Sequence, residues 1–234
     1  MYILSVLNPT VFIGNFEWRE PVTTLTDFLV ALVCWAAFYF FSQLKNSQSG
    51  AYPWFKKYFF VFAIGMTSAA WLGHGFQAYV ATSYKAIGWM FGATGLMLLQ
   101  MGSLTLIKAN LSRRMLKILP KWFVLQWLIA IVCMVYFLSI GIEQAFKVTQ
   151  INSVVALWGF VLPMHIFAYK KLAIQGSKII IGALLYSAIP GIIYSQKVSL
   201  SNWFNYHDIS HILMAIFMSI MFFGLYQLVK PVNS

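Results

Sequence analysis

Charged residues are scarce in this chain of 234 amino acids, and acidic residues are scarcer still. Only 9% of the residues are Asp, Glu, Lys or Arg, whereas soluble domains carry about 25%. Hydrophobic residues make up 61% of the chain. This composition excludes an ordinary soluble fold and indicates a protein that crosses a membrane several times. No stretch between the apolar runs is long enough to fold separately, so we expect residues 1–234 to form one membrane domain.

Cysteine is also rare, and the basic residues are dispersed. Cys34 and Cys133 are the only two cysteines and both fall inside apolar runs, which excludes a disulfide framework. The net charge of +11 is not gathered into one basic face or tail. We therefore expect no nucleic-acid partner.

Long apolar runs are what the sequence has instead of charge. Seven of them are long enough to cross a bilayer as a helix, which takes about 20 residues. The sequence therefore predicts an all-α fold, a bundle of seven transmembrane helices. We place these helices near residues 23–44, 56–80, 86–108, 120–141, 150–170, 177–195 and 207–229.

The loops between these runs carry charge unevenly. Most of the sixteen basic residues lie after the first, third and fifth helices or at the C-terminus: Lys45, Lys56, Lys57, Lys108, Arg113, Arg114, Lys117, Lys121, Lys170, Lys171, Lys178 and Lys230. The opposite side keeps four basic residues and every acid of the chain: Glu17, Glu20, Asp27, Glu143 and Asp208. The positive-inside rule then places the N-terminus outside and the C-terminus in the cytoplasm.

Three of the four histidines are expected at one depth in the membrane. His207 and His211 stand four residues apart at the start of the last helix, so they share one face. His74 lies some six residues from the outer end of the second predicted helix, roughly 9 Å below its terminus. His165 follows Pro163 near the cytoplasmic end of the fifth helix, and we interpret it as structural.

Three imidazoles can hold Zn²⁺ and leave a fourth position for water. Such a site also needs an acid or base and a group that orients the ligands. Asp27, about two turns into the first helix, and Asp208, three residues before His211, are the candidates for these roles. The sequence does not decide which acid takes which role. The competing interpretation is that histidines near the headgroups are tolerated without a metal.

This arrangement resembles the CREST superfamily of integral membrane proteins, which includes the alkaline ceramidases and the progestin and adipoQ receptors. The resemblance rests on a lone histidine late in the second helix, His74, and on the His-x3-His pair that opens the seventh. It implies that His74, His207 and His211 bind zinc. The segment Glu17-Trp18-Arg19-Glu20 is similar to the acidic segment with which ceramidases bind calcium, which implies calcium near Glu17 and Glu20.

Three short segments are also similar to bacterial ceramidase-like membrane proteins: Glu20 to Asp27, Gly73 to Phe76 and Asn205 to His211. This similarity implies a place in a bacterial inner membrane. Two positions depart from the ceramidase pattern. Ala70 stands where ceramidases carry a serine, with Thr67 as the nearest hydroxyl on that face, and the third helix has no aspartate.

Two functions from different classes follow. The leading hypothesis is a zinc-dependent hydrolase that cleaves an amide or ester bond of a membrane lipid, with Asp27 and Asp208 as its catalytic acids. The alternative is a non-catalytic seven-helix receptor or sensor with a structural metal site, which the two departures favour. A retinal-binding rhodopsin is disfavoured, because the last helix has no interior lysine and only Lys230 at its end.

Overall fold

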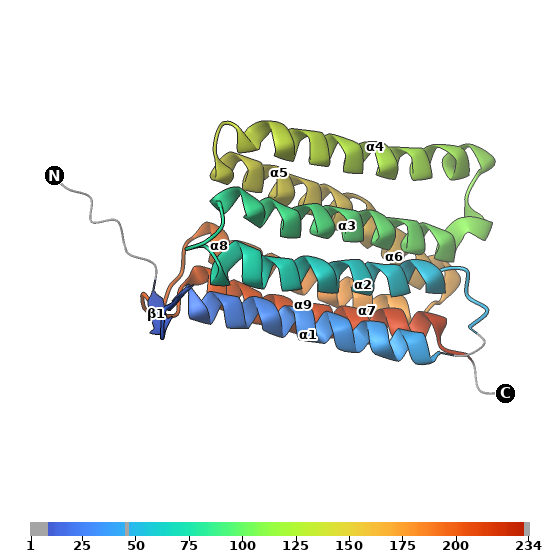
Figure 1. Ribbon diagram of the computed structural model, residues 1–234. Coiled ribbons are helices and arrows are strands. Elements are labelled where there is room, and N and C mark those ends of the chain that lie inside the picture. Colours follow the sequence, from blue (N-terminus) through green and yellow to red (C-terminus); the bar gives the residue numbers. More distant parts are fainter. Residues whose placement is uncertain (1–8, 45–46, 232–234) are drawn as a thin grey trace.

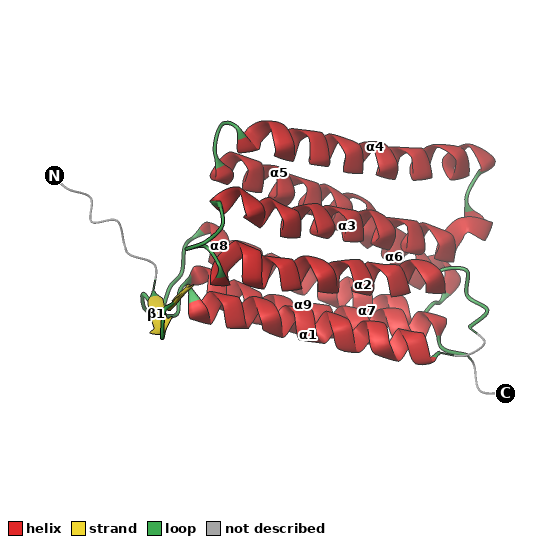
Figure 2. Cartoon of the chain, in the orientation of Figure 1, coloured by secondary structure: helices red, strands yellow, loops and turns green. Residues whose placement is uncertain are grey.

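The computed structural model describes residues 9–44 and 47–231. It is a bundle of long helices that run side by side, with a small hairpin at one end (Figures 1 and 2). The elements in chain order are β1 (Thr10–Ile13), β2 (Phe16–Arg19), α1 (Pro21–Gln43), α2 (Tyr52–Ser68), η1 (Ala69–Gly75), η2 (Thr82–Tyr84), α3 (Lys85–Ile107), η3 (Lys108–Asn110), α4 (Arg113–Leu138), α5 (Ile142–Val154), η4 (Val155–Val161), α6 (Leu162–Leu172), α7 (Gly176–Tyr186), α8 (Ala188–Ser195) and α9 (Tyr206–Val229).

Neighbouring elements join end to end into long helical rods. α2 continues into the π-helix η1, α5 continues through the π-helix η4 into α6, and α7 is followed directly by α8. Within the described residues, six rods are long and apolar enough to cross a membrane. The rod of α2 and η1 does not meet these criteria of length and hydropathy. The fold is therefore consistent with a multi-pass membrane protein.

The ends of the rods follow local sequence signals where such signals exist. Pro21 occupies the start of α1, where its missing N–H costs no helical hydrogen bond. Asn205 caps α9 through a capping box with Asp208. Elsewhere the predicted bounds differ from the observed ones: α4 begins at Arg113 and α5 at Ile142. Hydropathy misses these first turns because they are polar and extend beyond the apolar run.

The second predicted helix is shorter than expected at its outer end. Its rod ends at Gly75, not near residue 80, so His74 lies at the terminus and not six residues inside. The last turn is π-helical, and the Phe76 N–H donates to the Trp71 carbonyl at 2.8 Å. This wider turn occupies the sequence Ala69 to Gly75, where two glycines flank His74.

The chain is mostly helical, as the all-α prediction requires, but one short β-hairpin precedes the bundle. β1 and β2 form an antiparallel hairpin in which Thr10 pairs with Arg19 and Ile13 with Phe16. The turn between them is Gly14-Asn15, and Gly14 adopts a φ of 59° that an L side chain rarely adopts. Gly-Asn between two short apolar runs is a hairpin signal that the hydropathy analysis passes over.

The core that positions the site lies among α1, α2, α7 and α9. Phe41, Phe59 and Met221 are fully buried there. Gly224 of α9 lies directly against Ile180 of α7, where an added Cβ would be 2.3 Å from the Ile180 side chain. This close packing joins the second half of α9 to α7, and α9 also packs along α1. On the other side of the bundle, α4 and α5 lie beyond α3 (Figure 1).

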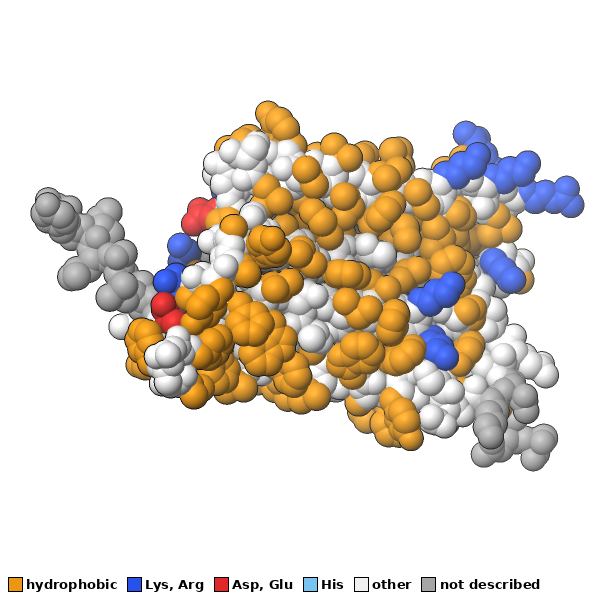
Figure 3. Space-filling model, in the orientation of Figure 1, with side chains coloured by type: hydrophobic (Ala, Val, Ile, Leu, Met, Phe, Trp, Pro, Cys, Tyr) orange, Lys and Arg blue, Asp and Glu red, His pale blue; other side chains and the backbone are white. Residues whose placement is uncertain are grey.

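The two ends of the bundle differ in charge. Figure 3 shows Lys and Arg side chains gathered at the end away from β1, and acidic side chains at the end near it. We call these the lysine-rich end, where α1, α3 and α9 finish, and the hairpin end, where α1 and α9 begin. Of the basic residues assigned to the cytoplasmic side, Lys45 lies outside the described residues. The described chain therefore begins and finishes at opposite ends of the bundle.

Candidate functional site

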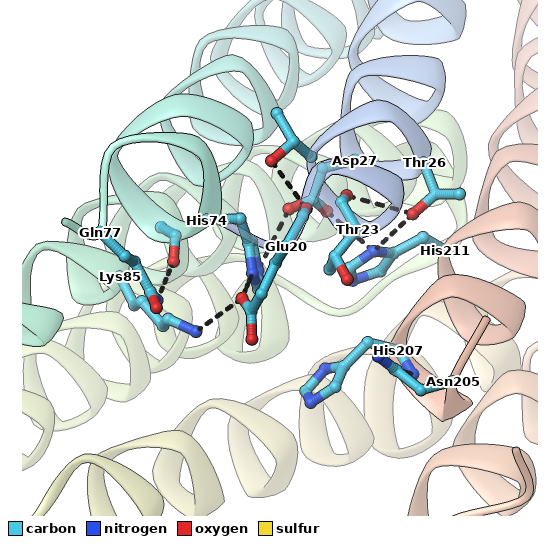
Figure 4. A network of polar contacts seen from close by, with 12 residues as sticks. Glu20, Thr23, Thr26, Asp27, His74, Gln77, Lys85, Asn205, His207 and His211 are labelled. Atoms are coloured by element: carbon cyan, nitrogen blue, oxygen red, sulfur yellow. Dashed lines mark hydrogen bonds and ion pairs between the residues drawn. The ribbon is translucent and has the colours of Figure 1, made fainter. Parts of the chain in front are cut away.

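The fold brings three imidazole rings together at the hairpin end. His74 comes from the last turn of η1, and His207 and His211 come from the first turns of α9. The ring centroids are 6.2 Å apart for His74 and His207, 6.2 Å for His74 and His211, and 6.3 Å for His207 and His211. The three rings thus form a nearly equilateral triangle (Figure 4).

The triangle is wider than a zinc ion requires. Three imidazoles on a tetrahedral ion, with Zn–N bonds of about 2.0–2.1 Å, place their ring centroids roughly 5 Å apart. The observed rings would each have to approach the others by about 1 Å. As they stand, the described residues contain no group of three or more His, Cys, Asp or Glu side chains positioned to hold a metal ion. Convergence of the rings is thus observed, and metal binding stays a prediction.

The π-helical turn sets the position of His74. Gly75 lies beside the start of α1: a Cβ there would be 3.4 Å from the Thr24 side chain of α1, and 3.2 Å from the Trp71 ring of η1 itself. Single π-turns inside helices are frequent at functional sites. His74 itself is buried, with 8% of its surface exposed.

Glu20 is a site residue that the sequence analysis missed as a partner of His74. Its Oε2 contacts Nδ1 of His74 and lies 3.6 Å from Nζ of Lys85 (Figure 4). Burial acts to raise the pKa of Glu20, but the hydrogen bond from His74 and the charge of Lys85 outweigh it and lower the pKa to about 2. Glu20 is therefore ionised at neutral pH. Its backbone is left-handed, with φ 45°, which is uncommon for a residue with a side chain.

Asp27 lies between two of the three rings. Its Oδ1 is 3.2 Å from Nδ1 of His211, and its Oδ2 is 3.5 Å from Nε2 of His74. The residue is 1% exposed, as expected for an acid that points into the bundle. Oδ2 is buried and has no hydrogen-bond partner among the described residues. A buried carboxylate oxygen without a partner is costly, so this atom indicates a missing proton or cation.

A sequence model of the DUF6962 family, a family of unknown function, matches residues 22–230. The chain belongs to the DUF6962 family. No curated protein and no solved structure shows significant similarity to it. The matched range contains Asp27, His74, His207 and His211, whereas Glu20 and the hairpin precede it.

In this DUF6962 protein, Asp208 has a clear role in folding. Its Oδ2 accepts a hydrogen bond of 2.7 Å from the Asn205 N–H, as one half of the capping box of α9. Among the described residues, no hydrogen bond or ion pair joins Asp208 to the three histidines. Its Oδ1 is buried and has no hydrogen-bond partner within the described part of the chain. A catalytic role for Asp208 stays a prediction.

A hydroxyl of α1 contacts one of the histidines. Thr26 Oγ1 is 3.4 Å from Nδ1 of His211, and it donates to the Thr23 carbonyl at 3.1 Å. Thr67, the hydroxyl singled out in the sequence, donates instead to the Ala63 carbonyl and accepts from the Trp35 indole. Threonines at a helix start are ordinary caps, so the sequence carries no signal for this role of Thr26.

His207 differs from the other two histidines in its surroundings. Its ring packs against Tyr194 of α8 at 5.2 Å and against Tyr206 at 4.3 Å. Neither ring nitrogen has a hydrogen-bond partner within the part of the chain that the structure describes. Both nitrogens of His207 are therefore available to a ligand.

Two predicted residues lie away from this cluster. Glu17 pairs with Arg19 at 2.7 Å, whereas Glu20 faces His74, so their carboxylates point to different partners. Calcium between them stays a prediction. His165 is buried between Ser103 and Ser177, each 3.1 Å away, and links α3, α6 and α7. This placement agrees with a structural role.

Proposed function

We propose that this protein is a zinc-dependent membrane hydrolase that cleaves an amide or ester bond of a lipid. The observation that carries the proposal is Asp27, whose carboxylate lies between His74 and His211 and keeps one buried oxygen without a partner. His74, His207 and His211 would hold the metal ion, and Asp27 would serve it as acid or base.

The hydrogen bonds around the rings support a ligand role. A metal-binding histidine commonly presents one ring nitrogen to the metal and donates the N–H of the other to a carboxylate. Glu20 contacts Nδ1 of His74, and Asp27 Oδ1 faces Nδ1 of His211. Both partners leave Nε2 of the ring for a metal. His207, with no partner on either nitrogen, would complete the set.

The charges of the cluster also favour a divalent cation. Glu20, Asp27 and Asp208 carry three negative charges when ionised, and Lys85 supplies one positive charge beside Glu20. Ionisation of both Asp27 and Asp208 would leave two negative charges in a buried site, beyond the pair of Glu20 with Lys85. Burial of unpaired charge is expensive, and an ion of charge +2 would neutralise it.

Hydrolysis of an amide or ester bond would use the metal ion, Asp27 and Glu20. Zinc, when bound, lowers the pKa of a water ligand to about 7 and polarises a carbonyl. Asp27 Oδ2 lies beside Nε2 of His74, where it could accept the proton of such a water and later donate it to the leaving amine or alcohol. Glu20 would hold the His74 ring in place through Nδ1. Ala70, fully buried, offers no hydroxyl here.

In this proposal the chain crosses the membrane seven times, and the rod of α2 and η1 forms the second span. The lysine-rich end would face the cytoplasm of a bacterium and the hairpin end the outside, since loops rich in Lys and Arg stay inside. The site would then lie near the outer leaflet, where the linkage region of a lipid meets the bundle. The resemblance to the ceramidases of the CREST superfamily agrees with a lipid substrate.

Metal analysis of the purified protein tests the metal site. We expect about one zinc per chain in the wild type and loss of most of it in His207→Ala and His211→Ala. His165→Gln is the control, because His165 lies in the other half of the bundle. Wild-type protein without bound zinc, even after incubation with zinc, would overturn the proposal.

Lipid hydrolysis then separates the two functions. We expect the zinc-loaded wild type to release fatty acid from a lipid amide or ester, and His211→Ala to be inactive. The receptor alternative rests on Ala70, which replaces the serine of the ceramidases beside His74, and on the lack of an aspartate in α3. Bound zinc without turnover on any lipid class would favour that alternative.

A further inference from the structure

A groove lies on the outer surface of α1 and α2, far from the histidines. It is found near the lysine-rich end, where α2 begins, and has a volume of about 380 Å³. Ligand pockets in proteins commonly measure about 300–1,000 Å³. Six residues line the groove: Phe38, Tyr52, Pro53, Lys56, Lys57 and Phe60.

Part of the groove lining is apolar. The rings of Phe38 and Phe60 meet across α1 and α2 with centroids 5.0 Å apart, and Phe60 is 38% exposed. The Tyr52 hydroxyl donates to the Phe41 carbonyl at 2.9 Å, so it is turned into the bundle. The rings of Phe38 and Phe60 therefore form an apolar strip on a surface that would face lipid. An acyl chain matches this lining.

Two lysines stand at the same groove without acidic partners. Nζ of Lys56 lies 5.5 Å from the Phe38 ring, and Nζ of Lys57 lies 5.7 Å from the Trp54 ring. Neither forms an ion pair among the described residues. All five acids of the sequence lie in β2, just before or in the first turns of α1, or at the starts of α5 and α9, all at the hairpin end. No Asp or Glu of this chain therefore pairs with the two ammonium groups, which leaves them open to an anionic group from outside.

We propose that this groove binds one anionic phospholipid. Its phosphate would lie on Lys56 and Lys57, and one acyl chain would lie along Phe38 and Phe60. Lysines beside the membrane surface attract anionic headgroups. A zwitterionic lipid fits less well, because its ammonium group would come close to the two lysine charges. The proposal does not depend on the metal site at the other end.

Native mass spectrometry of the full chain in detergent tests the proposal. We expect phosphatidylglycerol to bind on the order of tenfold more tightly than phosphatidylcholine with the same acyl chains, as two lysines near a headgroup imply. The double variant Lys56→Gln and Lys57→Gln should lose this preference. The control is Lys170→Gln with Lys171→Gln, which removes the same charge at the same end of the bundle but outside the groove, and it should keep the preference.

Two further measurements distinguish a lipid from its parts. An excess of inorganic phosphate should not displace phosphatidylglycerol, because the acyl chain contributes to binding. Phe60→Ala, at an exposed position, should weaken phosphatidylglycerol binding severalfold. Equal losses in both lysine double variants would show diffuse surface charge and overturn the proposal. Displacement by phosphate, or equal binding of the two lipids by the wild type, would overturn it as well.

Discussion

Oδ1 of Asp27 lies 3.2 Å from Nδ1 of His211, although the two residues belong to the first and last helices. This contact joins the starts of α1 and α9 at the point where three imidazoles converge. It also leaves Oδ2 of the same carboxylate buried beside His74 without a hydrogen bond.

Asp27→Asn should remove the charge of this carboxylate while keeping its shape. We expect zinc affinity to fall about 10-fold to 100-fold, because partners of metal-binding histidines contribute that much. Lipid hydrolysis, if present in the wild type, should be lost with the acid–base group. Zinc titration of the metal-free protein measures the first effect. Unchanged affinity would mean that Asp27 serves packing alone.

Glu20→Gln should weaken zinc binding in the same way, because the amide holds the His74 ring less firmly than the carboxylate. Glu17→Gln is the matched control, since Glu17 pairs with Arg19 on the same hairpin end and does not contact a histidine. We expect the control to bind zinc as the wild type does. An equal loss of zinc affinity in both variants would indicate a general effect of negative charge at the hairpin end.

The pKa of Glu20 also predicts how stability depends on pH. The folded protein lowers this pKa from 4.5 to about 2. The stabilisation by ionised Glu20 is therefore complete above pH 4.5 and is lost as the pH falls towards 2. Its magnitude is on the order of a few kcal/mol.

Melting curves of the metal-free protein in detergent between neutral pH and pH 3 measure this dependence. The melting temperature of Glu20→Gln should fall less with acid than that of the wild type. Parallel curves for the two proteins would show that Glu20 has an ordinary pKa.

Asp208→Asn should distinguish capping from catalysis. The amide oxygen of asparagine can still accept the hydrogen bond from the Asn205 N–H, so α9 should keep its first turn. We expect zinc content to be unchanged and turnover to stay within a fewfold of the wild type. A loss of about 100-fold or more in turnover, at normal zinc content, would instead assign Asp208 to proton transfer.

The proposed orientation predicts which loops a membrane-impermeant thiol reagent can reach. Asn202→Cys places a thiol on the exposed loop before α9 at the hairpin end, and Gln48→Cys places one on the exposed loop before α2 at the lysine-rich end. In intact cells we expect labelling of the first variant only, whereas both should react after lysis. The reverse pattern would place the lysine-rich end outside.

Much of this architecture could be predicted because its signals are local. Apolar runs longer than a bilayer crossing identify the rods, and the basic loops identify the lysine-rich end. The spacing of His207 and His211 places both on one face of any helix that contains them. The predicted helix bounds were less accurate where a helix extends into polar sequence, as at Arg113 and Ile142. They were also less accurate where a helix widens into a π-turn, as before Gly75.

The amino-acid sequence by itself determined the helical rods, the charge of the two ends and the pairing of His207 with His211, since hydropathy and helical periodicity act over short stretches. The partners of each ring were decided only by tertiary structure. Glu20 reaches His74, and Asp27 reaches His211, through the packing of η1 and α9 against α1. That packing joins segments far apart in the sequence, and no local pattern in the chain encodes it.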